Sequence, residues 1–180
     1  MKNFIVVFVL TIIFLIVLFF ATQKKYRGGS PINKGLFILG KLSMFISWMF
    51  FFFKALFPNY FLISSPVYLQ WVAVLLLLLA ITIEAIAFLR LGESTKFGLP
   101  EKESTLITRG IYSISRNPMY LAFAMICLAS SIFNPNIINV VSSIIGIAIH
   151  HKIILAEEKF LKANCSKDWN KYKNRTRRYI

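Results

Sequence analysis

The chain has 180 residues, of which 57 % are hydrophobic and 16 % aromatic, and it carries a net charge of +14. This composition is too apolar for a soluble domain of this size and places the chain in a membrane. The same charge in a soluble protein would suggest nucleic acid. Here, however, the basic residues lie between and after long apolar runs, where they set membrane orientation and meet anionic headgroups. We therefore expect membrane lipids as partners and no nucleic acid.

Three apolar runs fill the N-terminal half, at residues 4–20, 36–57 and 67–89. A signal peptide is the alternative interpretation of the first run. The run is long for a signal peptide and is followed by a poor cleavage site, so we predict a retained helix. The second run carries Lys41 and Lys54 near its ends, where long side chains reach the headgroups. These runs predict an N-terminal region, residues 1–89, of three transmembrane helices.

Two further apolar runs, residues 119–133 and 137–156, are joined by the turn signal Asn134-Pro135-Asn136. At 1.5 Å per residue the first of them is only about 22 Å long, short of a hydrocarbon core of roughly 30 Å. We therefore expect a short hairpin, residues 119–156, that packs inside the bundle without fully crossing. The predicted fold is an all-α integral membrane protein of about five transmembrane helices.

Eighteen of the 21 lysines and arginines fall in three segments: the loop after the first run, the loop after the third run, and the C-terminal tail. Five crossings with the N-terminus outside and the C-terminus in the cytosol place all three segments on the cytosolic side, as the positive-inside rule requires. We expect the inner or plasma membrane of a prokaryote. The cytosolic face then consists of residues 90–117 and the tail from about residue 150.

The segment 109–120 is polar and turn-forming between apolar runs. Asn117 and Pro118 predict a helix start, because Asn accepts the first free amide hydrogens and proline fits the first helical position. Gly110 permits a close backbone approach to a ligand or an unusual φ. Aromatic faces suit a cation and a guanidinium suits a carboxylate; the segment offers these in Tyr112, Tyr120 and Arg116. An ordinary connecting loop is the alternative.

A second polar feature, His150-His151 and Glu157-Glu158, lies at the end of the last apolar run. Each histidine precedes a glutamate by seven residues and shares a helix face with it. The two glutamates point about 100° apart, so we expect one to face a pocket and the other to meet the lysines of the tail. The alternative is a helix end that simply emerges into the headgroups. We expect the polar ends of the two runs to meet and hold a cofactor.

Glu84 lies about 9 Å inside the third run by helix rise. A charged group at that depth should face protein, either paired with a basic group of the following loop or in a pocket. We expect no metal site, because adjacent histidines point apart on a helix and no HExxH motif or cysteine cluster supplies further ligands. A Rossmann motif, a P-loop and a GxSxG elbow are also absent from the sequence.

Residues 116–120, Arg-Asn-Pro-Met-Tyr, followed by residues 154–158, Ile-Leu-Ala-Glu-Glu, resemble the RHPxY...hxxEE signature of the isoprenylcysteine carboxyl methyltransferase family. That family is in turn similar to the phospholipid N-methyltransferases. The lead-in at residues 106–112 resembles the family as well, and so does the tail, with Trp169, Tyr172 and the pair Arg177-Arg178. The resemblance covers roughly residues 90–180.

The resemblance implies a membrane enzyme that binds S-adenosylmethionine (SAM) on the cytosolic side, in a region formed by residues 90–180, and takes a lipophilic small-molecule, prenylated or lipid acceptor from the bilayer. It assigns a catalytic role to Arg116 and Asn117. It assigns cofactor binding to Gly110, Tyr112, Arg116, Pro118, Tyr120, His150, His151, Glu157 and Glu158. The chain departs from the family where Asn117 replaces a histidine and where Cys165-Ser166 replaces the usual Phe-Gly.

A sulfonium donor is already an electrophile, so the enzyme's main tasks are alignment and exclusion of water. A carboxylate acceptor needs no base, whereas an amine must lose its proton, and Asn117 cannot titrate as histidine does. The sequence therefore favours O-methylation of an isoprenylcysteine-like carboxylate over N-methylation of a phospholipid amine. An NADPH-dependent membrane reductase and a non-enzymatic protein with a lipid-binding tail are the remaining alternatives.

Overall fold

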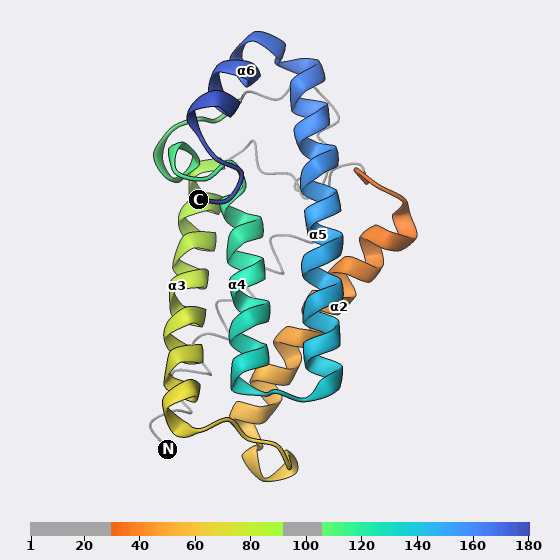
Figure 1. Cartoon of the computed structure of the whole chain (residues 1–180), viewed down its shortest axis with the longest axis vertical. Coiled ribbons are helices and arrows are strands. Elements are labelled where there is room, and N and C mark those ends of the chain that lie inside the picture. Colours follow the sequence, from red (N-terminus) through yellow and green to blue (C-terminus); the bar gives the residue numbers. More distant parts are fainter. Residues whose placement is uncertain (1–29, 92–105) are drawn as a thin grey trace.

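The computed structural model describes residues 30–91 and 106–180, and the elements named within these ranges are all helices (Figure 1). Three are long and apolar enough to cross a membrane: α2 (Lys34–Leu56), α3 (Val67–Leu91) and α5 (Ile137–Asn164). Helix α4 (Pro118–Phe133) is shorter, and α6 (Ser166–Arg175) with the 3-10 turns η2 (Pro58–Tyr60) and η4 (Gly110–Ser113) completes the set. The predicted all-α membrane fold is confirmed. The run at residues 4–20 and the basic residues at 24–27, 96 and 102 lie outside the described residues.

The helix boundaries follow local sequence signals. The side chain of Asn33 accepts a hydrogen bond from the Gly35 amide (2.9 Å) at the start of α2, and that of Asn136 accepts from the Ile138 amide (2.9 Å) at the start of α5. The predicted end of the last run at residue 156 is wrong, since α5 continues to Asn164. The added residues include Glu, Lys, Leu and Ala, which favour helix and carry it past the apolar run.

Helices α3 and α4 pack closely through small residues. Ala73, Ala80 and Ala87 on α3 and Ala122 and Ala129 on α4 are all completely buried. Without large side chains between them the two backbones approach closely, which is the usual basis of helix association in lipid. This contact fixes the upper end of α4, where the polar segment begins, against α3.

Helices α2 and α5 also make a close contact. A Cβ atom at Gly40 would lie 2.6 Å from Cγ2 of Ile149, so no larger residue fits there without displacing α5. Toward the α4–α5 turn, the Ser47 and Ser143 hydroxyls are hydrogen-bonded at 2.7 Å. Such interhelical bonds add to packing in a membrane. Together these contacts hold α2, α4 and α5 in one arrangement.

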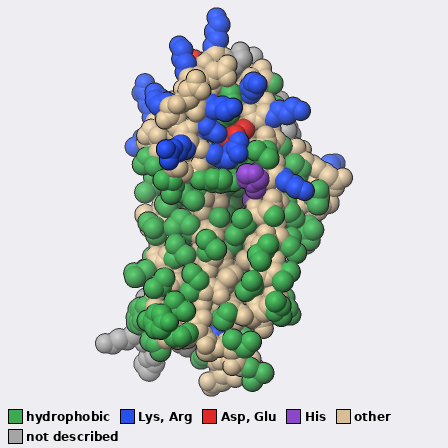
Figure 2. Space-filling model, viewed as in Figure 1, with side chains coloured by type: hydrophobic (Ala, Val, Ile, Leu, Met, Phe, Trp, Pro, Cys, Tyr) green, Lys and Arg blue, Asp and Glu red, His purple; other side chains and the backbone are tan. Residues whose placement is uncertain are grey.

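The polar end of the molecule lies about one hydrocarbon thickness from the α4–α5 turn. Glu158 follows Ile137 by 21 residues, a rise of about 32 Å, close to a hydrocarbon core of roughly 30 Å. Figure 2 shows hydrophobic side chains over most of the visible face and lysines and arginines gathered at the α6 end. Helix α5 is thus long enough to cross, and the expectation of a run too short to cross applies only to α4.

Candidate active site

Glu158 lies at the centre of a charged cluster near the C-terminal end of α5. Its Oε1 accepts hydrogen bonds from Nε of Arg116 (3.1 Å) and Nδ2 of Asn117 (3.1 Å). Its Oε2 lies 2.9 Å from Nη2 of Arg178. The side chains of Arg116 and Glu158 are 7 % and 9 % exposed, so these charge-assisted bonds are largely shielded from water. We call these four side chains the Glu158 clamp.

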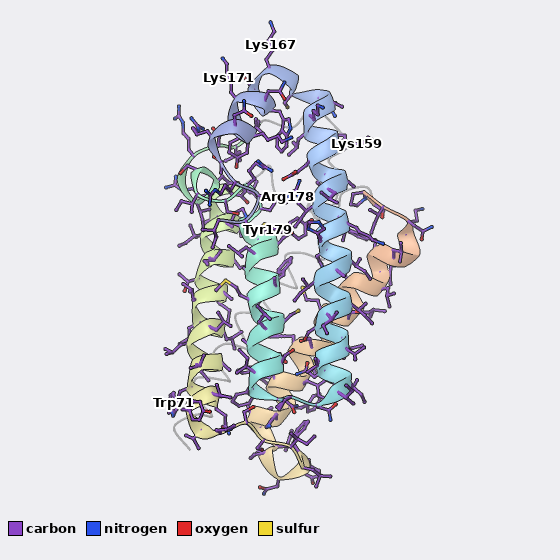
Figure 3. The ribbon with its side chains drawn as sticks, in the orientation of Figure 1. Trp71, Lys159, Lys167, Lys171, Arg178 and Tyr179 are labelled. Atoms are coloured by element: carbon purple, nitrogen blue, oxygen red, sulfur yellow. The ribbon has the colours of Figure 1, made fainter. Side chains whose placement is uncertain are left out.

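Residues 176–180 form a C-terminal strap that runs beside residues 115–117. The Arg116 amide donates to the Arg177 carbonyl (3.0 Å), and Nη1 of Arg116 donates to the Thr176 carbonyl (2.8 Å). The strap brings Arg178 and Tyr179 into the space between the upper ends of α4 and α5 (Figure 3). Arg116 therefore holds both Glu158 and the strap, and the predicted grip of Arg116 on a cofactor carboxylate stays a prediction.

Helix α6 fastens the strap to η4. The hydroxyl of Tyr172 donates to the Tyr112 carbonyl (2.6 Å), and burial raises the pKa of Tyr172 to about 12, so this hydroxyl keeps its proton. The ring of Trp169 lies 5.6 Å from the guanidinium carbon of Arg116. Gly110 opens η4 with φ 65°, a left-handed conformation that glycine adopts readily.

Glu157 and Glu158 face different partners, as their angular separation predicts. The hydroxyl of Tyr120 donates to Oε1 of Glu157 (2.7 Å). The Tyr120 ring lies 6.0 Å from the ring of Phe123 and 5.8 Å from that of His150. The partners of Glu158 are arginines, however, and not the predicted lysines.

The two adjacent histidines point apart and make different bonds. Nδ1 of His150 lies 2.7 Å from the carbonyl oxygen of Gly146. Because a carbonyl can only accept, Nδ1 carries the proton in this bond. Nδ1 of His151 lies 2.6 Å from the hydroxyl of Tyr179, which ties α5 to the strap.

A cavity of about 60 Å³ lies between α2, α4, α5 and the strap. Its polar wall comes from Tyr120, His150, His151 and Tyr179. The apolar wall of the cavity includes Met44, Cys127 and Gly146. The sequence did not predict these residues, because nothing distinguishes a neutral pocket residue from its neighbours in an apolar run. It also gave Tyr179 no role, although an aromatic residue after two arginines in a basic tail is a usable signal.

Two other expectations, at Asn117 and at Glu84, can be compared with the structure. Asn117 and Pro118 do precede and begin α4, but the expected side-chain cap is wrong, since the Asn117 amide instead donates to Glu158 and to the Arg178 carbonyl (3.3 Å). Glu84 is 6 % exposed on the α3 face that packs on α4, and it forms no ion pair with a described residue. Within residues 30–91 and 106–180 no group of His, Cys, Asp and Glu could hold a metal.

Residues 68–168, more than half of the chain, match the family model described as phospholipid methyltransferase. No curated protein and no solved structure matches the chain significantly. The matched residues include all of α4 and α5 and three members of the Glu158 clamp, whereas Arg178 and Tyr179 of the strap lie beyond the match.

Proposed function

Because this chain belongs to the phospholipid methyltransferase family, we propose that it transfers a methyl group from SAM to the amine of an ethanolamine phospholipid at the cytosolic surface of the membrane. Membership supports a membrane methyltransferase in general. The donor, the acceptor and the side of the membrane are inferred from the residues at the polar end. The basic residues gathered there support a cytosolic location for it.

The observation that carries the proposal is the meeting of Tyr120, Glu157 and His150 beside the Glu158 clamp. A carboxylate and electron-rich rings suit the positive sulfonium of SAM, and a carboxylate also accepts bonds from ribose hydroxyls. The cavity of about 60 Å³ is too small for the whole donor. We therefore place only the reacting groups in the cavity and the rest of SAM over the polar end.

The remaining predicted residues receive supporting roles in this proposal. Arg116 and Asn117 position the end of α5 through Glu158, and this is the role we now prefer for them. Gly110, Tyr112 and Pro118 do not line the cavity, and in this proposal they fix η4 and the start of α4 beside it. SAM, when bound, supplies the electrophilic methyl group, and these residues orient it and exclude water.

The lining of the cavity favours an amine over a carboxylate acceptor. Both arginines near it, Arg116 and Arg178, are bonded to Glu158. The side chains facing the reacting space are aromatic rings, His150 and the Tyr120 hydroxyl held by Glu157. This environment stabilises a cation and repels an anion.

O-methylation of an isoprenylcysteine-like carboxylate remains the second candidate, because Lys41 offers a positive charge that a carboxylate could meet. The positive charge of Lys41 is close enough to act on both His150 and Glu157. An anionic group entering between α2 and α5 would meet this lysine. In an ethanolamine phospholipid the same lysine would meet the phosphate, so Lys41 fits either acceptor.

Calorimetric titration of the detergent-purified chain tests the enzyme class. We expect micromolar binding of S-adenosylhomocysteine (SAH), the product of SAM, and no binding of NADPH. NADPH binding would indicate a reductase, and binding of neither ligand by a folded, monodisperse sample would indicate a non-enzymatic protein.

Methyl transfer in reconstituted vesicles then tests the acceptor. Vesicles contain either phosphatidylethanolamine or a neutral lipid with an isoprenylcysteine analogue, and the donor is SAM with a labelled methyl group. We expect label in the ethanolamine lipid. Label only in the analogue would replace the proposed acceptor by the second candidate.

A further inference from the structure

His150 is buried, and its hydrogen bonding leaves one ring nitrogen available. Its side chain is 6 % exposed, and Nδ1 donates to the Gly146 carbonyl one helical turn earlier. In the neutral ring this bond places the only proton on Nδ1 and the lone pair on Nε2. No hydrogen bond of Nε2 is found among the described residues, and Nε2 is not one of their fully buried polar atoms, so it remains accessible to a small molecule.

The His150 ring lines the cavity, with Tyr120 and Phe123 at 5.8 Å on the α4 side. An imidazole nitrogen with a free lone pair can accept a hydrogen bond from a molecule that enters such a cavity. A leucine or phenylalanine at this position would fill the same space without offering an acceptor. Nε2 is therefore placed to accept a proton from a ligand in the cavity.

The size of the cavity limits that ligand to a small group. A cavity needs a volume of roughly 10–15 Å³ to hold a single water molecule. The cavity of about 60 Å³ can therefore hold a group the size of a protonated amine with its neighbouring carbon atoms. The rings of Tyr120 and Phe123 suit such a cation. Protonated alkyl amines are the main form near neutral pH and have no lone pair with which to attack.

We infer that Nε2 of His150 takes the proton from the acceptor amine and so prepares it for methylation, an inference that rests on the proposed amine acceptor. The ammonium N–H bond breaks, and the proton passes to Nε2. The free lone pair then forms the nitrogen–carbon bond to the donor's methyl group, while the carbon–sulfur bond breaks and its electron pair stays on sulfur. The imidazolium afterwards returns its proton to water at the polar end.

With His150 as the base, the lack of a titratable group at Asn117 no longer disfavours an amine acceptor. The sequence favoured a carboxylate because Asn117, in place of the family histidine, cannot act as a base. Asn117 instead donates to Glu158, whereas His150 lies on the cavity wall. The base therefore comes from α5 and not from the segment before α4.

Other titratable groups surround His150 and must be considered in any measurement against pH. These are Lys41 from α2, Tyr120 and Cys127 from α4, His151 and Glu157 from α5, and Tyr179 from the strap. Since they remain in a His150 variant, comparison of the variant with the unaltered protein isolates the contribution of His150.

The activity test compares the unaltered protein with His150→Gln in phosphatidylethanolamine vesicles. At about pH 7 we expect kcat to fall about 10²- to 10⁴-fold, the usual contribution of a general base. The ratio of the kcat of the unaltered protein to that of the variant should be at least about tenfold smaller near pH 9.5, because bulk water then removes the proton from part of the amine. The dissociation constant for SAH, measured by calorimetry, should change less than about threefold, since SAH lacks the positive sulfonium that the His150 ring would face and most of it lies over the polar end. Exposed Lys159, changed to Gln, is the control on the same helix.

Nitrogen-15 NMR of labelled histidine reports which ring nitrogen carries the proton and does not require SAM. The chain has two histidines, so the His150 signals are those missing from the variant. We expect Nδ1 to be protonated and Nε2 unprotonated, with the Nε2 shift changing when a short-chain phosphatidylethanolamine is added. If His150→Gln aggregates, His150→Asn, whose amide can still donate toward Gly146, takes its place.

Each outcome decides the inference. A deficit that is the same at both pH values, an unchanged kcat, a loss of SAH binding in the folded variant, or the opposite tautomer would overturn the role of His150. If the unaltered protein binds SAH but methylates no ethanolamine lipid, the proposed acceptor fails and this inference fails with it. If it methylates the lipid while His150→Gln does so equally well, only this inference fails.

Discussion

Replacement of Glu158 by glutamine removes the negative charge of the Glu158 clamp with little change of shape. Arg116 and Glu158 are each less than one-tenth exposed, so water screens their interaction weakly, whereas the Arg178 side chain is 33 % exposed and contributes less. Removing one partner of a buried ion pair costs about 3–5 kcal/mol, because the other charge is left uncompensated. Glutamine still accepts one hydrogen bond, so we expect the lower value, about 3 kcal/mol.

Hydrogen exchange measures this loss where it should appear. The amides of Arg116 and Thr176 are bonded to the carbonyls of Arg177 and Tyr172 and are protected only while the strap and α6 are in place. A loss of about 3 kcal/mol corresponds to exchange about 10²-fold faster at these amides. Amides in the middle of α3 should not change, and Lys159→Gln, which also changes one charge on α5, should leave all of them as they are. Exchange at both strap amides within about threefold of the unaltered protein would refute the view that the clamp holds the strap.

Three further changes test other parts of the site. Glu157→Ala should abolish SAH binding in calorimetry while the protein stays folded, because Tyr120 loses its acceptor and the proposed donor site its carboxylate; unchanged affinity would remove Glu157 from the site. Asn117→His should keep SAH affinity within about threefold, since histidine can still donate to Glu158, and a total loss of activity would contradict the alignment of Asn117 with the family histidine. Tyr172→Phe should remove from the tyrosinate absorbance titration a group with a pKa of about 12. Because this value is raised above the ordinary 10.0, the stability that Tyr172 provides should be present below pH 10 and lost as pH rises toward 12, and the variant should lack that loss.

The helical framework could be predicted because apolar runs and turn signals act locally. The starts of α3 and α5 coincide with the predicted residues, and those of α2 and α4 lie within two residues of them. The end of α5 was missed because a membrane pattern ends where polarity begins, whereas a helix can continue beyond the apolar run on good helix formers.

The site could be predicted only in part, because its bonds join segments that are distant in sequence. The angular separation of Glu157 and Glu158 follows from helix geometry, and their different partners agree with it. That Arg178 would reach Glu158 depends on the path of the strap, which has no periodic pattern to reveal it. Asn117 was expected to cap α4, but its side-chain amide donates instead to the buried carboxylate of Glu158 and to the Arg178 carbonyl.

The C-terminal strap also sets the order in which the protein can be completed. Glu158 is synthesised 20 residues before Arg178, the second arginine that it binds. At about 5–20 residues per second this is a delay of roughly 1–4 s, during which the membrane helices can already insert while Glu158 has only one of its two arginines. A defect in residues 176–180 should therefore yield a chain that is fully inserted in the bilayer yet inactive, and cellular quality control would meet it as an assembled membrane protein whose polar end is open.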